Sequence, residues 1–418
     1  MSSTDPRRVL SATSEAIAIV RSSDADAPSP KPGFYAVSRA SYSFFTSASD
    51  DVVEIPEVFN SQETLEFLGL RPEIANAIFE AWHDLQQTPG ELGYGDDIIT
   101  HAEYYVKRMA DIEDAWCPTH DWRQALFKMG VNSDLTDAIL DSDFNEIRAT
   151  KSASEWVIDT FQSSWQFLEG LDGRVRRKDY EVNCLLMPSP DVVLRVLDYH
   201  GPPYLDLGTV VAMPNRVYGK TMMHKGGAMM GLVSVFKEDG SLHLPKLFSD
   251  GPTDFHPTRR DLVCFTKDID IAEQYANFSQ RRVPVEEGTV LSFAVPNELV
   301  NGHQVKEIPK VDWQRLVWRA RHPERSIDMD QIRPSLMKYV EAPVLRGPIC
   351  GVASKKMGHL ESSESSELAR QYLKTKDGAF ASQYVFQSAP AKMELQDRCA
   401  GWVWVRSMRY SPKLAKRF

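Results

Sequence analysis

A stretch near the middle of the chain, residues 261–278, reads as a strand that leads directly into a helix. The segment DLVCF is apolar and rich in strand-forming residues, and IDIAEQYANF carries apolar residues at helical spacing. Thr266 stands at the junction, where a helix N-cap is expected, and Tyr275 lies on the apolar face of the helix. An aromatic side chain there either packs in a core or forms a wall of a nucleotide pocket, where a flat ring can stack on it. Both interpretations stay open from this stretch alone.

Other groups of reactive side chains do not complete a catalytic motif. WCPTH contains Cys117 and His120, and HAE contains His101 and Glu103, but the second cysteine that a zinc deaminase needs is missing. The chain has no GxxxxGK[ST], no GxGxxG after a strand and no GxSxG nucleophile elbow. We therefore expect no metal site.

The composition is that of a globular protein with a negative net charge. The chain has 418 residues, of which 42% are hydrophobic, and a formal net charge of -10. No overall basic field attracts nucleic acid or an acidic membrane surface, and no apolar run reaches the ~18 residues of a membrane span. Five widely spaced cysteines favour a reducing compartment. We expect an intracellular protein, cytoplasmic or nuclear, that binds neither nucleic acid nor membranes.

The first half of the chain divides into a polar lead and a helical region. Residues 1–32 are rich in Ser, Ala, Asp and Pro, which predicts a disordered lead. Residues 33–182 are predicted to form a mainly helical domain, in which RPEIANAIFEAWHDL carries one apolar stripe. SASEWVIDTFQSSWQFLEGLDG begins with a capping box, Ser152 to Glu155, and Gly173 is expected to end that helix.

The second half, residues 183–418, is predicted to be an α+β domain of mixed or antiparallel strands. Short β-type runs alternate there with Pro, Gly and Asp clusters. The runs are VNCLLM (182–187), VVLRVLDY (192–199), GTVVAM (208–213), DLVCF (261–265), GTVLSFAV (288–295), RLVWRA (315–320), SQYVFQS (382–388) and GWVWVRS (401–407). The predicted fold class is therefore α+β, with the helical domain first.

Two of these runs carry short motifs. In the first, Tyr275 follows Cys264 by eleven positions. The second is SQYVFQS, with Gln383 at its second position. These elements resemble the ADP-ribosyltransferase fold of poly(ADP-ribose) polymerases and toxin-like families. There a G-[IV]-Y-F-[AST] strand precedes a helix tyrosine at that spacing, and the late strand E-Y-[IV]-[VF]-Y begins with the catalytic glutamate.

A third element of that family, a strand of the form [LW]-[YH]-H-G-[ST], should come earlier in the chain. The favoured match is RVYGKT, residues 216–221, where Gly219 stands at the position of the histidine. The rival match is Tyr199-His200-Gly201 in DYHGPP, where Pro202 replaces the hydroxyl residue. The choice between the two stays open.

The resemblance implies a site for NAD, which would be the substrate, and no metal. Tyr275 would stack on the nicotinamide ring, and Gln383 would stand in place of the catalytic glutamate. The cofactor-binding residues that it implies are Tyr218, Gly219, Thr221, Cys264, Phe265, Thr266 and Tyr275. The activity implied is mono-ADP-ribosyl transfer or NAD glycohydrolysis, with a protein acceptor or partner held by the helical domain.

The departures from the family pattern keep an alternative open, a catalytically inactive binding or scaffold protein. Gln383 can form hydrogen bonds but lacks the charge that stabilises an oxocarbenium-like transition state. Gln383→Glu is accordingly expected to raise nicotinamide release. Without the resemblance, Tyr275 is an ordinary core aromatic, Gln383 satisfies backbone groups, and His200 and His224 are structural or exposed.

Overall fold

The structure is a computed structural model of the whole chain. It describes residues 6–19, 30–43, 51–87, 96–184, 194–195, 213–233, 235–237, 241–249, 253–256, 259, 261–322, 334–360, 362–363 and 365–408.

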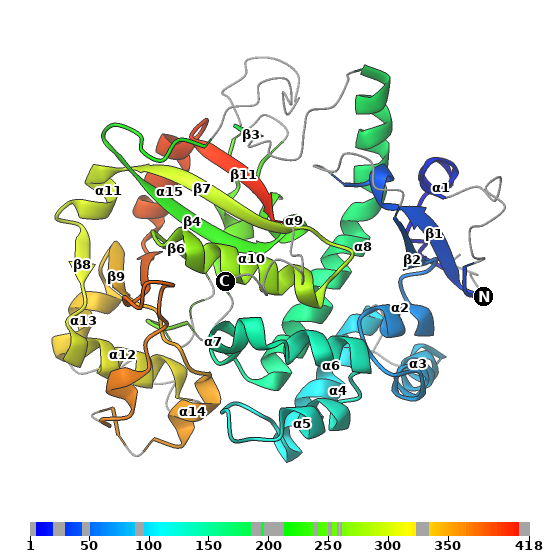
Figure 1. Cartoon of the computed structure of the whole chain (residues 1–418), viewed down its shortest axis with the longest axis horizontal. Helices are drawn as coiled ribbons and strands as arrows, with labels where there is room; N and C mark the ends of the chain where they lie inside the picture. The colour runs from blue at the N-terminus through cyan, green and yellow to red at the C-terminus, as the bar shows by residue number, and fades with distance from the viewer. Residues whose placement is uncertain are drawn as a thin grey trace.

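Helices make up most of the first half, together with one antiparallel pair of strands (Figure 1). The elements are α1 (Ala12–Ala18), β1 (Phe34–Ser38), η1 (Arg39–Ser41), β2 (Val52–Pro56), α2 (Gln62–Phe67), α3 (Pro72–Gln87), α4 (Ile98–Ile112), α5 (Trp122–Lys128), α6 (Ser133–Ile139), η2 (Ser142–Phe144), α7 (Asn145–Arg148) and α8 (Ala153–Cys184).

The long helix α8 begins as predicted and ends later than predicted. The capping box is confirmed, because Ser152 N donates to Glu155 Oε2 at 2.7 Å and Glu155 N donates to Ser152 Oγ at 3.3 Å. The predicted stop at Gly173 is wrong. A glycine inside an exposed helix costs only about 1 kcal/mol, and the two residues after it, Arg174 and Val175, are buried and hold the next turn.

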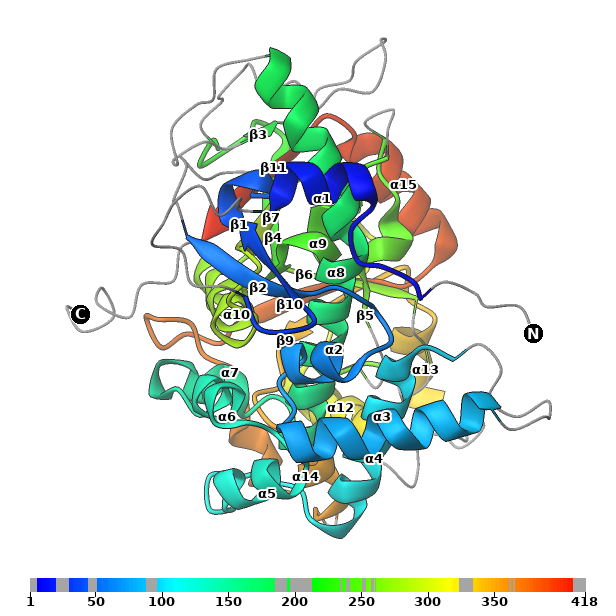
Figure 2. The same cartoon turned by 90° about the vertical axis from the view of Figure 1, so that its right-hand side faces the viewer.

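Part of the predicted disordered lead is helical. Val9 and Leu10 are buried, and the side chain of Ser11 caps α1 by accepting a hydrogen bond from Ser14 N. Ser11 N donates to Asp172 Oδ1 on α8 at 2.8 Å, and Figure 2 shows α1 lying across α8. These contacts order residues 6–19, whereas residues 20–29 lie outside the described part of the chain.

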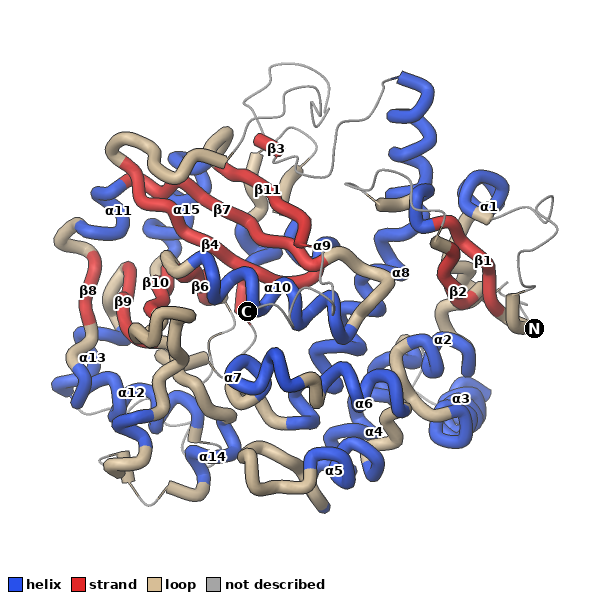
Figure 3. The backbone as a smooth tube through the Cα atoms, in the orientation of Figure 1, coloured by secondary structure: helices blue, strands red, loops and turns tan. Residues whose placement is uncertain are grey.

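The second half is built on one large sheet (Figure 3). Its strands run in the order β3-β11-β7-β4-β6-β10-β9-β8, with β5 on the edge of β6; all pairs are antiparallel except β8 with β9. The strands are β3 (Leu194–Arg195), β4 (Lys220–Ala228), β5 (Phe248–Ser249), β6 (Leu262–Thr266), β7 (Gly288–Pro296), β8 (Val305–Glu307), β9 (Val344–Pro348), β10 (Ser382–Phe386) and β11 (Val403–Met408).

The second half also contains helices, and their combination with a mainly antiparallel sheet confirms the α+β class. They are α9 (Met229–Val233), η3 (Leu244–Leu247), α10 (Ile269–Arg282), α11 (Asn297–Asn301), α12 (Lys310–Arg321), α13 (Pro334–Val340), α14 (Ser354–Gly358), η5 (Leu368–Arg370) and α15 (Ala389–Cys399). The strand predicted at RLVWRA is wrong, because these residues lie in α12. Trp313, Leu316, Val317 and Ala320 are all buried, and their spacing is that of one helix face.

The runs 261–265, 288–295, 382–388 and 401–407 contain strands as predicted. VNCLLM begins inside α8, and most of the runs 192–199 and 208–213 lies outside the described residues. Among the residues that the structure describes, no helix has the length and apolar character needed to cross a bilayer.

Helix α10 lies between the sheet and the helical half (Figure 1). It approaches the sheet closely where the strands carry glycine. A Cβ on Gly226 would lie 1.8 Å from the carbonyl oxygen of Ala272, and one on Gly288 would lie 2.4 Å from that of Ala276. On its other side, Ile271 and Phe278 belong to the hydrophobic core of the helical half. The two halves therefore share α10 as a common packing element.

Candidate functional site

The strands that carry the predicted motifs are neighbours in the sheet. Strands β4, β6 and β10 lie side by side (Figure 3), and their register sets Thr266 opposite both His224 and Gln383. Ser292 of β7 is opposite His224 and also opposite Trp404 of β11. Directly opposed residues project from the same face of a sheet. Gln383, Thr266, His224, Ser292 and Trp404 thus form one line across five strands, which we call the central row.

His224 is a buried, neutral member of the central row. Its side chain is 5% exposed, and its Nδ1 lies 2.8 Å from Ser292 Oγ. Burial, assisted by the positive charge of Arg406, lowers the pKa of His224 to about 4. The sequence interpretation treated this histidine as structural or exposed. The signal that could have found it is its alternation with Met222 and Gly226 along a continued strand.

Gln383 is held by a buried ion pair. Its side chain is 8% exposed, and its amide nitrogen donates to Asp254 Oδ2 and, at 3.4 Å, to the carbonyl oxygen of Pro348. Asp254 also accepts a hydrogen bond from Cys350 N at 2.9 Å and pairs with Arg321 at 2.6 Å. The carboxamide is thus oriented by a carboxylate that already has a cationic partner.

Arg321 connects this ion pair with the helical half. Its guanidinium donates to the carbonyl oxygens of Val352 at 2.6 Å and Thr150 at 3.3 Å. Burial acts to lower the pKa of Arg321, but nearby anionic charge, mainly that of Asp254, raises it overall. Arg321 therefore stays protonated, and the charge of Asp254 is balanced inside the protein.

Tyr275 lies on α10 and faces the helical half. It packs beside the helical core, near the side chain of Thr150. Burial raises the pKa of Tyr275 to about 12, and the charges of Asp254 and Arg321 also act on it. Tyr275 and Gln383 therefore have the same ion pair as a neighbour, although Tyr275 is not part of the central row.

The predicted residues at the start of β4 do not join the central row. Tyr218 is fully exposed in the turn before the strand, and Gly219 has a φ of 70°, which favours glycine there. Thr221 donates to Asn297 Oδ1 at 2.7 Å, and it lies three positions before His224, so it projects from the opposite face. The rival motif at residues 199–201 lies outside the described residues.

The predicted residues on β6 divide between the two faces. Thr266 lies in the central row, and Cys264 shares its face; burial raises the pKa of the Cys264 thiol, which makes it a poor nucleophile. Phe265 faces the opposite core, 4.9 Å from Phe293 between ring centroids. Thr266 is not the helix N-cap that we expected. The N-cap is Asp268, whose backbone N–H donates to Thr266 Oγ1 at 3.0 Å.

Asp268 helps to fix the position of β10. Its side chain does not cap α10 but accepts a hydrogen bond from Ser382 N at 2.8 Å, next to Gln383. In the same way, Asp270 accepts a hydrogen bond from Lys376 N at 2.8 Å. The N-terminal end of α10 thus holds the segment that leads into β10.

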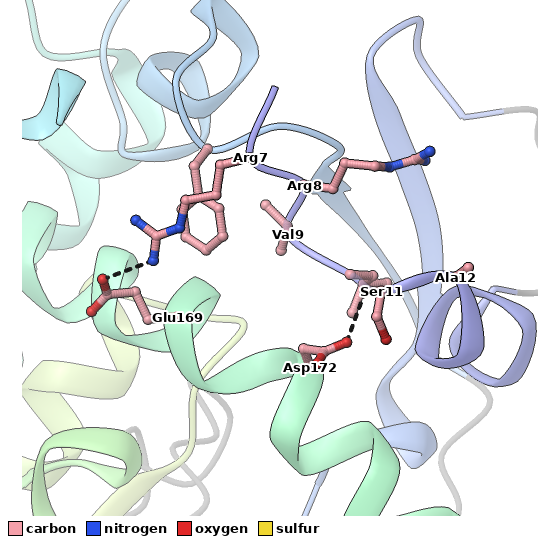
Figure 4. Close-up of a pocket in the computed structure, with 9 residues that line it drawn as sticks. Arg7, Arg8, Val9, Ser11, Ala12, Glu169 and Asp172 are labelled. Atoms are coloured by element: carbon pink, nitrogen blue, oxygen red, sulfur yellow. Dashed lines mark hydrogen bonds and ion pairs between the residues drawn. The ribbon is translucent and has the colours of Figure 1, made fainter. Parts of the chain in front are cut away.

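A surface pocket of about 360 Å³ lies in the helical half, between the N-terminal segment and α8 (Figure 4). Its charged side chains have partners: Arg7 pairs with Glu169 at 3.3 Å and with Asp97 at 3.5 Å. None of its residues was predicted as a site residue. In the part of the chain that the structure describes, no group of three or more His, Cys, Asp or Glu side chains could hold a metal ion.

Comparisons of the chain with protein-family models, with curated proteins and with solved structures found no match.

Proposed function

We propose that the C-terminal half is an ADP-ribosyltransferase-like module that binds NAD along the central row and transfers or hydrolyses ADP-ribose only slowly. The observation that carries the proposal is the alignment of His224, Thr266 and Gln383 on three adjacent strands. These strands bear the elements that resemble the family, and His224 supplies a histidine on the first of them.

The row offers hydrogen bonds to a ligand rather than charge. Ser292 occupies Nδ1 of His224, so Nε2 is the nitrogen that can meet a ribose hydroxyl or a carboxamide. Gln383 would take the position of the family's glutamate, but it brings no negative charge to an oxocarbenium-like transition state. Removing one such stabilising interaction typically reduces kcat by about 10²–10³-fold. The charge of Asp254 does not replace it, because Arg321 already balances that carboxylate.

The second candidate is a binding or scaffold protein that transfers nothing. The observation that favours it is the hydrogen bond from Gln383 to Asp254, which draws the carboxamide into the buried ion pair. In this function the helical half would hold a protein partner, and the row would either bind NAD as a structural ligand or not bind it.

We further propose an intracellular location, because Cys117, Cys264, Cys350 and Cys399 are free thiols.

The test is a calorimetric titration of NAD into the full chain, with nicotinamide release measured on the same samples. His224→Ala should weaken NAD binding by about tenfold or more, the loss of roughly one good hydrogen bond. His303→Ala, at an exposed histidine, is the control and should bind like the wild type. NAD binding with measurable release supports the enzyme, and NAD binding without release supports the scaffold. Unchanged binding by His224→Ala would exclude the row as the NAD site.

A further inference from the structure

Two donor nitrogens on β11 have no hydrogen-bond partner among the described residues. One is the indole Nε1 of Trp404, whose side chain is only 2% exposed, and the other is Nε of Arg406. The large majority of buried side-chain polar groups in folded proteins have a partner, so an unpaired donor requires an explanation. Nε of Arg71, Arg282 and Arg321 also lacks a partner among the described residues, so the indole N–H of Trp404 is the more informative of the two donors.

Both donors project from the face that carries the central row. Trp404 and Arg406 are two positions apart, so their side chains leave the same face about 6–7 Å from one another. Trp404 is opposite Ser292, which contacts His224, and Arg406 is opposite Val290. One outer nitrogen of Arg406 pairs with Glu273 of α10, and its Nε has no partner among the described residues.

The neighbourhood of these donors combines aromatic surface with positive charge. Trp402 lies next to Trp404 with ring centroids 6.4 Å apart, and the Lys220 ammonium is 4.2 Å from the centroid of the Trp402 ring. Met222 of β4 packs against the same cluster. Lys220 adds a cation beside Trp402, while the charge of Arg406 is already paired with Glu273. The two N–H donors therefore fit a group that is rich in acceptor oxygens.

We propose that β11 provides a phosphate-binding subsite at the end of the central row, in which Trp404 Nε1 and Arg406 Nε donate to phosphate oxygens. In the proposed function those oxygens belong to the pyrophosphate of NAD, and that part of the inference rests on the proposed function. A free phosphate or pyrophosphate ion has the same chemistry. The experiment therefore has separate arms for the dinucleotide and for the free anion.

Two variants remove the proposed donors: Trp404→Phe removes the indole N–H, and Arg406→Lys replaces the guanidinium, with its Nε–H, by an ammonium. Trp404→Phe keeps an aromatic ring, and Arg406→Lys keeps the charge that pairs with Glu273. The controls are Trp82→Phe on α3 of the helical half and Arg398→Lys, the second at an exposed ion pair with Glu298. Calorimetry with the full chain would use NAD, ADP-ribose, nicotinamide and inorganic pyrophosphate as probes. We expect each test variant to weaken NAD and ADP-ribose binding by about five- to tenfold, to leave nicotinamide binding unchanged, and the controls to match the wild type.

The shift of the unfolding midpoint on adding pyrophosphate gives an independent readout. Trp404→Phe should lower the midpoint without ligand, because the smaller ring leaves a cavity at a side chain that is only 2% exposed, so the shift caused by the ligand is the quantity to compare. A shift in Trp404→Phe as large as that of the wild type would overturn the subsite.

The arms separate the two proposals. Wild-type NAD binding that neither variant weakens overturns the subsite and leaves the proposed function standing. Pyrophosphate binding that both variants weaken, without NAD binding, supports the subsite as a free-anion site and overturns the proposed function. Binding of none of the phosphate-containing probes by the folded wild type overturns both.

Discussion

The seam between the two halves and the central row are both polar, but they are built differently. At the seam, Arg282 pairs with Asp159 at 2.7 Å and lies over the rings of Trp156 and Phe278, and Arg281 pairs with Asp141 at 2.9 Å. The row consists of neutral side chains and ends at the indole N–H of Trp404, which has no hydrogen-bond partner among the described residues. The seam also leaves one such group, Nε of Arg282, but that guanidinium is held by a carboxylate and by two aromatic rings. The charge pairs of the seam stabilise the fold, whereas no described contact accounts for the indole N–H of Trp404, which a ligand would explain.

The largest effect is expected at the ion pair that links the two regions. Arg321→Met would leave the carboxylate of Asp254 buried without its cation, which typically costs about 3–5 kcal/mol of unfolding free energy. Urea unfolding measures the loss. Arg398→Met, at an exposed pair, is the control and should cost at most about 1 kcal/mol.

The double variant Asp254→Asn with Arg321→Met sharpens this prediction. It removes both charges, so it should recover part of the stability that Arg321→Met loses. A single variant as stable as the control would contradict the assignment of a buried, coupled pair.

The seam should show its charge pairing in the pH dependence of stability. Burial acts to raise the pKa of Asp159, but Lys151 and Arg282 outweigh it and hold that pKa well below the usual range. The group therefore contributes stability that is present above its unfolded pKa of about 4 and is lost as pH falls toward the folded value. Asp159→Asn should lower the free energy of unfolding by about 2 kcal/mol at pH 7. It should also make the fall of that free energy at acidic pH less steep. An equally steep fall in urea unfolding between neutral and strongly acidic pH would contradict this account.

An added carboxylate in the row should have a smaller effect. Gln383→Glu would bring a second carboxylate against Asp254, whose cationic partner is Arg321. We expect the free energy of unfolding to fall by about 1–2 kcal/mol at pH 7, because two carboxylates so close together repel each other unless one of them is protonated. The folded variant should bind that proton more tightly than the unfolded chain, so the deficit should shrink as pH falls.

This outcome differs from the expectation based on sequence that Gln383→Glu raises nicotinamide release. Release measured beside stability decides between them. Higher release with unchanged stability would mean that the carboxamide turns away from Asp254 in the working state of the site.

The smallest effect at neutral pH concerns His224. Its folded pKa of about 4 is below the unfolded value of about 6.5, so the unfolded chain binds the proton first as pH falls. As the pH falls from about 6.5 to about 4, this group therefore lowers the free energy of unfolding progressively. Above about pH 6.5 it has no such effect. His224→Gln should make this part of the profile less steep, as measured by unfolding at half-unit pH steps. A profile as steep as that of the wild type would mean that His224 is not buried as a neutral ring.

Local signals in the sequence predicted much of the fold. The capping box at Ser152, the strand at 262–266 and the helix that carries Tyr275 all depend on neighbouring residues, and the structure has each of them. The errors at Gly173 and RLVWRA arose where tertiary packing decided the outcome. Buried residues beyond Gly173 continue α8, and burial of Trp313 and Val317 selects a helix over a strand.

The site was less predictable because it depends on strand register. Thr266 and Gln383 were chosen from motifs, and the register brings them together. His224, Ser292 and Trp404 become neighbours only through pairing between segments far apart in sequence, and a shift of one residue would send each to the opposite face. The pairing of Asp254 with Arg321 is equally non-local. No periodicity within one segment indicates such contacts.

The most direct test of the central claim is the NMR signal of the His224 ring during an NAD titration of the full chain labelled with ¹⁵N-histidine. His224→Gln would assign the signal, and His303 would serve as the internal control. We predict that the His224 nitrogen shifts move in a saturable way with NAD at neutral pH, while those of His303 stay in place. Unchanged His224 shifts at millimolar NAD, in a sample with an intact unfolding transition, would contradict the assignment of the central row as the ligand-binding face.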